Sequence, residues 1–268
     1  MVIGNRKFEE NRTYIMGILN VTPDSFSDGG KFNNIDAALK HTEQMIKDGA
    51  DIIDVGGEST RPNYTKISDE EEISRVAPVI EAIKKNFDIP VSIDTYKSAV
   101  GEAAIKSGAD LMNDIWGFKY DEKMADITAK YNKTCCLMHN RKEAVYNNFM
   151  EDVLADLKES VDIALKAGVK KENIMLDPGV GFAKSYEQNL EITNKLEMLN
   201  TLGYPVLLGT SRKSMIGLTL DLPADQRVEG TLATTVLAVI KNAMFVRVHD
   251  VLENKRIIKM TERILGKA

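Results

Sequence analysis

Residues 91–113, VSIDTYKSAVGEAAIKSGADLMN, contain the unit from which the fold follows. A short apolar run at 91–94 is followed by a helical pattern at 99–106, and a second apolar run comes at 111–113. Short apolar runs bounded by turn residues or charges are typical of strands buried on both faces. A helix between two such strands predicts that the strands are parallel neighbours, because a crossover helix is how parallel strands are joined.

The same alternation of strand and helix recurs along the whole chain. Eight apolar runs are predicted strands, at 14–19, 51–55, 91–94, 111–113, 134–138, 174–177, 206–208 and 245–248. Helical patterns are predicted at 35–48, 70–85, 99–106, 123–130, 153–167, 190–199, 229–241 and 251–265. Several of these helices end at a glycine, as at Gly49, Gly108 and Gly168, which is a common helix terminator.

Eight strand–helix units indicate an α/β fold that closes into one (β/α)8 TIM barrel, and the length of 268 residues suits such a barrel. An open sheet that binds dinucleotides would carry G-x-G-x-x-G after its first strand, and Gly29-Gly30 lacks that spacing. No linker or change of composition divides the chain. We therefore expect a single domain over 1–268, with 1–13 as an N-terminal extension whose order the sequence leaves open.

Composition narrows the functional classes. The formal net charge is −5 and no basic cluster is evident, which argues against nucleic-acid binding. No apolar run approaches the length of a membrane span, and the N-terminus lacks the apolar core of a secretory signal. The two cysteines, Cys135 and Cys136, are adjacent on an apolar run, which favours core packing over a disulfide. We expect a cytoplasmic protein that does not bind membranes.

Active sites of such barrels lie at the carboxyl ends of the strands. Polar residues occupy most of these positions: Asn20, Gly56-Gly57, Asp94, Asn113, Met138-His139, Asp177, Gly209-Thr210-Ser211 and His249. Turn-forming residues also end strands for purely structural reasons, but that explanation weakens when five or more such positions face one mouth. Carboxylates and amides in a pocket can form paired hydrogen bonds with the edge of a flat heterocycle.

Cations follow the last two strands, where barrels often bind phosphate. Ser211-Arg212-Lys213 follows the seventh strand, and Arg247 and His249 end the eighth. Solvated surface charge explains Arg212 better than it explains Lys213 or Arg247. Arg247 lies inside an apolar run, so its charge requires a partner.

The first two connections are long, at 21–32 and 56–67. Long barrel loops with Gly and Ser hinges are typical of lids that close over a substrate. A tolerated surface insertion is the alternative explanation.

These segments together resemble the dihydropteroate synthase family. The two most specific stretches are MGILNVTPDSFSDGG at 16–30 and DVGGESTRP at 54–62. The family's other marks follow in order: SIDT at 92–95, ND at 113–114, MHN at 138–140, DPGVGF at 177–182, TSRK at 210–213 and RVH at 247–249. The resemblance runs from about Tyr14 to the C-terminus, and no motif is replaced.

The resemblance implies a transferase of folate biosynthesis. Its members join 4-aminobenzoate to 6-hydroxymethyl-7,8-dihydropterin diphosphate, release diphosphate and form 7,8-dihydropteroate. It also implies Mg²⁺ as cofactor and a homodimer. The implied pterin-binding residues are Asp94, Asn113, Ile115, Met138, Asp177, Phe182, Lys213 and Arg247, of which Asp94, Lys213 and Arg247 are catalytic. Asn20, Arg247 and His249 would bind diphosphate, with Asn20 also contacting the metal. Phe26, Thr60, Arg61, Pro62, Ser211 and Lys213 would form the 4-aminobenzoate subsite.

Two other functions remain open at this point. A pterin-using methyltransferase would share the pterin slot, but it needs neither the diphosphate cations nor Arg61-Pro62. A non-catalytic pterin-binding relative would be expected to lose Asn20, Lys213 or residues of the second loop, and all of these are present. Trp116 is expected to pack beside the pocket, and the apolar helix near 232–240 is a candidate subunit contact.

Overall fold

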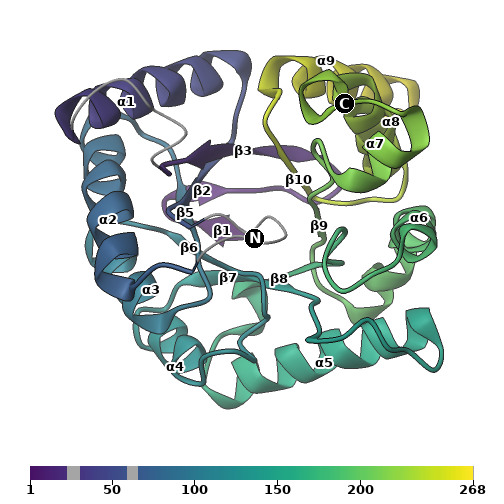
Figure 1. Cartoon of the computed structure of the whole chain (residues 1–268), viewed down its shortest axis with the longest axis horizontal. Helices are drawn as coiled ribbons and strands as arrows, with labels where there is room; N and C mark the ends of the chain where they lie inside the picture. The colour runs from purple at the N-terminus through teal and green to yellow at the C-terminus, as the bar shows by residue number, and fades with distance from the viewer. Residues whose placement is uncertain (23–30, 59–65, 268) are drawn as a thin grey trace.

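The computed structural model describes residues 1–22, 31–58 and 66–267. Its central sheet has eight parallel strands in the order β8-β7-β6-β5-β4-β3-β10-β9. A parallel bridge between Leu176 and Val206 joins β8 to β9, so the sheet closes into the ring seen in Figure 1. The strands are β3 Tyr14–Asn20, β4 Ile52–Gly56, β5 Val91–Asp94, β6 Leu111–Asp114, β7 Thr134–Met138, β8 Ile174–Asp177, β9 Leu207–Leu208 and β10 Phe245–Val248.

Helices surround this ring, so the predicted TIM barrel is confirmed (Figure 1). They are α1 Lys31–Asp48, α2 Asp69–Asn86, α3 Ser98–Lys106, α4 Lys123–Lys130, α5 Phe149–Lys166, α6 Tyr186–Asn194, α7 Ser214–Leu220, α8 Val228–Ile240 and α9 Val251–Ile264. Gly49, Gly108 and Gly168 have φ of +104°, +111° and +96°, the left-handed conformation expected after a helix. Within the described ranges, no helix has the length and apolar character needed to cross a membrane.

The helix predicted at 190–199 is wrong in its bounds. Helix α6 begins earlier, because Ser185 forms a capping box with Gln188 and so fixes the first turn. Lys195 has non-helical ψ, and a separate 3-10 segment, η3 Leu196–Leu202, follows it. Helix α7 after the seventh strand was not predicted, since it is too short to show a helical period.

Side chains alternate between two cores because successive strand residues point to opposite faces. Ile53, Val55, Cys135 and Leu137 belong to the larger core, which lies between the strands and the helices. A smaller core contains the residues of opposite parity, which fill the barrel at the amino end of its strands: Met16, Ile52, Leu111, Cys136, Met175, Leu207 and Phe245. The adjacent cysteines therefore face different cores, and both are free and fully buried.

The N-terminal residues form a hairpin of β1 Val2–Ile3 and β2 Arg6–Lys7. Figure 1 shows it across the centre of the ring. Ile3 and Phe8 are buried in the smaller core, and the Phe8 ring meets that of Phe245 with centroids 5.4 Å apart. The segment before the first barrel strand therefore closes the amino end of the barrel with apolar side chains. The sequence pattern does not predict this N-terminal hairpin, because strands of two residues are too short to show an alternation of apolar and polar residues.

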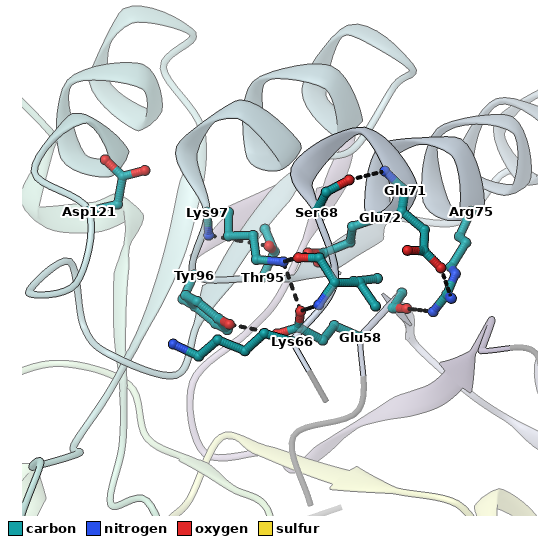
Figure 2. Close-up of polar contacts among 12 residues, drawn as sticks. Glu58, Lys66, Ser68, Glu71, Glu72, Arg75, Thr95, Tyr96, Lys97 and Asp121 are labelled. Atoms are coloured by element: carbon teal, nitrogen blue, oxygen red, sulfur yellow. Dashed lines mark hydrogen bonds and ion pairs between the residues drawn. The ribbon is translucent and has the colours of Figure 1, made fainter. Parts of the chain in front are cut away.

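A buried ion cluster joins the connections that follow β4 and β5 (Figure 2). Lys97 Nζ lies 2.8 Å from Glu58 Oε2 and 2.8 Å from Glu72 Oε2, and it donates to the Ile67 carbonyl at 2.8 Å. Tyr96 Oη donates to Glu58 Oε1 at 2.6 Å. The three charged side chains of the cluster are at most 10% exposed. One ammonium thus neutralises two carboxylates from different segments and holds those segments beside the carboxyl ends of the strands.

The charges in this cluster depend on one another. Burial tends to lower the pKa of Lys97, but its hydrogen bonds to Glu58 and Glu72 outweigh this and raise the pKa. Burial raises the pKa of Glu72, against the opposing effect of Lys97. The Glu58 pKa is lowered because Lys97 and Tyr96 outweigh its burial. Removing the ammonium would leave two buried carboxylates without a countercharge.

We therefore expect Lys97→Met to lower the free energy of unfolding by about 3–5 kcal/mol at pH 8, the usual cost of breaking a buried ion pair. Without the cation, the folded-state pKa values of Glu58 and Glu72 rise above their unfolded values. A raised carboxyl pKa favours the folded state below the unfolded pKa and disfavours it as the pH rises. The deficit should therefore shrink between pH 8 and pH 5, as measured by urea denaturation. Lys85, which is exposed at the far end of α2, provides the control Lys85→Met, which should change stability by less than about 0.5 kcal/mol. A deficit that stays constant across this pH range would contradict the account.

Candidate active site

Strand alternation explains which polar side chains meet at the carboxyl end of the barrel. Phe245 lies in the smaller core, and Arg247, two residues further along β10, has the same parity. Ile52 and Asp54 are related in the same way on β4. The pattern continues with Met16 and Asn20, Leu111 and Asn113, Cys136 and Met138, and Met175 and Asp177. On β4, β6, β8 and β10 the interior changes from apolar to polar within one step of two residues, whereas on β3 it takes two steps and on β7 Met138 remains apolar. The polar groups therefore lie directly above an apolar layer.

Arg247 forms the charged centre of this site. Its Nε donates to Asp54 Oδ2 and its Nη2 to Asp94 Oδ2, each at 2.6 Å. Asn113 Nδ2 donates to Asp54 Oδ2 at 3.3 Å. The side chains of Arg247, Asp94 and Asp54 are 19%, 9% and 0% exposed. Arg247 was expected to have a partner because its charge lies in an apolar run. That partner is a pair of carboxylates, Asp54 on β4 and Asp94 on β5.

Asp54 belongs to the candidate site, although the sequence pattern assigns it no role beyond its place in the DVGGESTRP stretch. It is fully buried and contacts both Arg247 and Asn113. The available signal was its position. An acidic residue in an otherwise apolar strand, at the parity of the other interior residues, has to have a partner.

Only one of the two Asp94 carboxylate oxygens has a hydrogen-bond partner among the described residues. Its Oδ2 accepts from Arg247, whereas its Oδ1 is buried and has no hydrogen-bond partner among the described residues. Burial raises the pKa of Asp94 to about 7, while the Arg247 charge opposes that rise. A buried acceptor without a partner is costly, so an N–H donor from a bound molecule would stabilise it.

Asp177 and Lys213 lie on the opposite side of Arg247 from β5. Burial raises the pKa of Asp177 to about 6, and a hydrogen bond from the Gly179 N–H at 2.6 Å opposes this. Burial and the nearby Arg247 charge lower the pKa of Lys213 to about 8. Lys213 Nζ lies 4.3 Å from the centre of the Phe182 ring. This side therefore presents a carboxylate and an ammonium beside an aromatic face.

Apolar side chains form a cluster at the same end of the barrel. Tyr96, Ile115 and Met138 make a small buried cluster, against which Trp116 and Phe182 pack. Trp116 thus packs against an apolar cluster close to the polar groups of the candidate site. Apolar and aromatic side chains beside a few polar groups are typical of sites that bind small flat molecules.

His249 and Ser211 form the remaining edge of the site. Ser211 Oγ lies 3.0 Å from His249 Nδ1 and accepts the His249 backbone N–H at 3.2 Å. Arg212 turns away and pairs with Asp250, in keeping with its expected surface role. Lys213, predicted for both the pterin and the 4-aminobenzoate subsites, lies on the side of Asp177 and Phe182 described above.

Asn20 stands next to Asp94 across Gly56. The strand register aligns these three residues, and a Cβ on Gly56 would lie 3.5 Å from Asn20 Oδ1 and 3.8 Å from Asp94 Oδ2. The Asn20 amide oxygen and the Asp94 oxygen that accepts from Arg247 thus lie close to Gly56 on either side. Phe26, Thr60, Arg61 and Pro62, predicted for the 4-aminobenzoate subsite, lie outside the described residues.

Comparison with known proteins agrees with this geometry. Residues 16–249 match the pterin binding enzyme family. A dihydropteroate synthase of Clostridium beijerinckii is 67% identical over 267 residues, covering 99% of each chain. One from Bacillus subtilis is 56% identical and covers 96% of this chain and 90% of its own.

Solved structures agree as well. The dihydropteroate synthase of Clostridium difficile, solved in the presence of pteroic acid, superposes with a TM-score of 0.94 at 52% identity, covering 96% of this chain and 99% of the other. That of Xanthomonas albilineans, with 4-aminobenzoic acid, gives a TM-score of 0.91 at 39% identity, covering 95% and 94%. On its sequence and its fold alike, this chain belongs to the pterin binding enzyme family, among the dihydropteroate synthases.

Proposed function

We propose that this chain condenses 4-aminobenzoate with 6-hydroxymethyl-7,8-dihydropterin diphosphate, forming 7,8-dihydropteroate and diphosphate. The observation that carries this proposal is the unpartnered Oδ1 of Asp94 beside the Arg247–Asp54 pair. A pterin edge offers the N–H donors that this oxygen lacks. The relatives solved with pteroic acid and 4-aminobenzoic acid support the same pair of substrates.

The pterin is proposed to lie against the apolar cluster with its amino edge toward Asp177. Asn113 and Asp94 would complete the hydrogen bonds along that edge, and Lys213 would donate to the ring carbonyl side. Ile115, Met138 and Phe182 would line the pterin slot. Two carboxylates and an amide match adjacent N–H groups on a planar ring, whereas a diphosphate alone would not require them.

The reaction then follows from the charges. The C–O bond to diphosphate breaks, and the electron-rich pterin ring delocalises the resulting positive charge. The carboxylate of Asp94 stabilises that charge, and Arg247 and His249 stabilise the departing anion. The aniline nitrogen of 4-aminobenzoate forms the new C–N bond and loses a proton. No protein nucleophile is required, in accord with the burial of both cysteines.

We propose that Asn20 would hold Mg²⁺ beside the departing diphosphate. Oxygen ligands suit Mg²⁺, and this ion commonly takes one or two protein ligands together with phosphate oxygens. Asn20 Oδ1 lies close to Gly56, with Asp94 on the other side, so the donor set fits. When bound, the ion would supply positive charge to the leaving diphosphate.

A second subunit is proposed at the face formed by α7, α8 and α9, which lie together in Figure 1. Large apolar side chains are exposed on all three helices and at the residue after α9: Leu218, Leu220, Ile240, Met260, Ile264 and Leu265. Such a patch is typical of an interface. We also propose a cytoplasmic location, which two free cysteines support.

The dimer proposal makes a direct prediction. Leu218→Glu should shift the protein from dimer to monomer in sedimentation equilibrium, because a carboxylate would be buried at the interface. Val145 is equally exposed but lies on the β7–α5 connection, so Val145→Glu should leave the mass unchanged. A wild-type protein that sediments as a monomer would remove the proposal.

The reaction is tested by measuring diphosphate release from the pterin diphosphate, with and without 4-aminobenzoate, in Mg²⁺ and in EDTA. We expect release that requires Mg²⁺ and is matched by dihydropteroate formation. Pterin binding without release would point to a non-catalytic relative. Binding of a methylated folate in its place would point to a methyltransferase.

Lys213→Gln should lower kcat by about 10²–10³-fold, because a fixed cation beside the ring and the leaving group is lost. Arg212→Gln is the matched control, since it removes the neighbouring cation, which pairs with Asp250 away from the site. That variant should keep nearly full turnover. A near-normal rate for Lys213→Gln would refute the role given to this residue.

A further inference from the structure

Lys184 lies at the end of the connection between β8 and α6, residues 178–185, and its ammonium is fully occupied. Its Nζ lies 2.9 Å from the Gly179 carbonyl, 3.0 Å from the Phe182 carbonyl and 2.8 Å from His139 Nδ1. An ammonium has three N–H donors, so each has one acceptor. The Lys184 side chain therefore stabilises the β8–α6 connection, and it has no N–H left to donate to a ligand.

His139 fixes the position of this ammonium from the neighbouring strand. The His139 side chain is fully buried, and its Nε2 lies 3.0 Å from Asp156 Oδ2. Burial lowers the pKa of His139 to about 4, so the ring is neutral. Since Asp156 accepts the Nε2 proton, Nδ1 is the acceptor for Lys184. Arg141 Nε also donates to Asp156, which completes a chain from Arg141 to Lys184.

The two carbonyls bound by Lys184 belong to the residues that shape the pterin slot. Gly179 donates its N–H to Asp177 Oδ1 at 2.6 Å, and its φ is +69°. A Cβ on Gly179 would lie 1.9 Å from the His139 carbonyl, so this close approach of β7 and β8 needs glycine. Phe182 places its ring 4.3 Å from Lys213 Nζ. Lys184 therefore touches neither proposed substrate position, but it holds the backbone at Gly179, two residues after Asp177, and at Phe182 itself.

We infer that Lys184 is a positioning residue for the pterin, which it serves by tying the β8–α6 connection to His139. This inference rests on the proposed placement of the pterin against Asp177 and Phe182. It adds a requirement that the family motif DPGVGF does not contain, because the motif ends two residues before Lys184.

Steady-state kinetics of Lys184→Met test this inference in the full-length enzyme. The methionine keeps the length of the side chain but removes all three donors. We expect the KM for the pterin diphosphate to rise about tenfold or more, with the KM for 4-aminobenzoate changed by less than about threefold. A general loss of structure would change both constants, and it would lower the melting temperature far more than the control does. Lys195→Met at the opposite end of α6 is that control, since the Lys195 side chain forms a solvent-exposed ion pair with Glu191.

Rescue distinguishes the ammonium from the bulk of the side chain. Lys184→Cys places a thiol in a chain whose own cysteines are both buried, so bromoethylamine should modify the new thiol and restore an ammonium of lysine length. Recovery of the pterin KM supports the inference, and modification without recovery overturns it. If Lys184→Met does not fold, His139→Gln is measured in its place and should give the same selective rise.

The outcomes separate this inference from the function on which it rests. A wild-type enzyme that forms no dihydropteroate would overturn the proposed function. A wild-type enzyme that is active, together with Lys184 and His139 variants whose pterin KM is unchanged, would overturn the positioning role alone.

Discussion

The pairing of Arg247 with Asp54 and Asp94 is the interaction on which the rest of the site depends. A guanidinium inside a barrel loses its hydration, and it is stable only when carboxylates replace the water. Both carboxylates come from other strands, β4 and β5, so the pairing also fixes where β10 stands relative to them. The charge proposed to stabilise the leaving diphosphate is thus held by the same contacts that align three strands.

The apolar half of the barrel makes these charges effective. Ile3 and Phe8 from the N-terminal hairpin, together with inward residues such as Phe245, keep water from the floor of the site. Electrostatic interactions are stronger in such surroundings than in water. Burial accordingly raises the pKa of Asp177 to about 6 and lowers that of Lys213 to about 8, which brings an acid and a base close in proton affinity.

The fold could be predicted from the sequence because each of the eight buried strands appears as an apolar run. The place of the candidate site could be predicted because active sites of such barrels lie at the carboxyl ends of the strands. The predicted residues from Asn20 to His249 that the structure describes do gather at the carboxyl end of the barrel. Asp54 was missed because a single strand does not show which acidic residue faces inward. Lys184 was missed for a different reason: its partners are backbone carbonyls and a histidine on another strand, and no spacing in the sequence encodes them. The residues predicted in the first two loops lie outside the described ranges.

Because Cys135 and Cys136 point in opposite directions, the accessibility of each thiol measures the opening of a different part of the protein. One thiol faces the layer between sheet and helices, and the other faces the interior of the barrel. Burial raises the pKa of both, so neither reacts as a thiolate in the closed state. Alkylation at Cys135 reports separation of a helix from the sheet, and alkylation at Cys136 reports opening of the ring. The alkylation rates of two adjacent residues therefore report two different motions. The ratio of these rates shows whether the barrel strands separate at the same time as the helices leave the sheet.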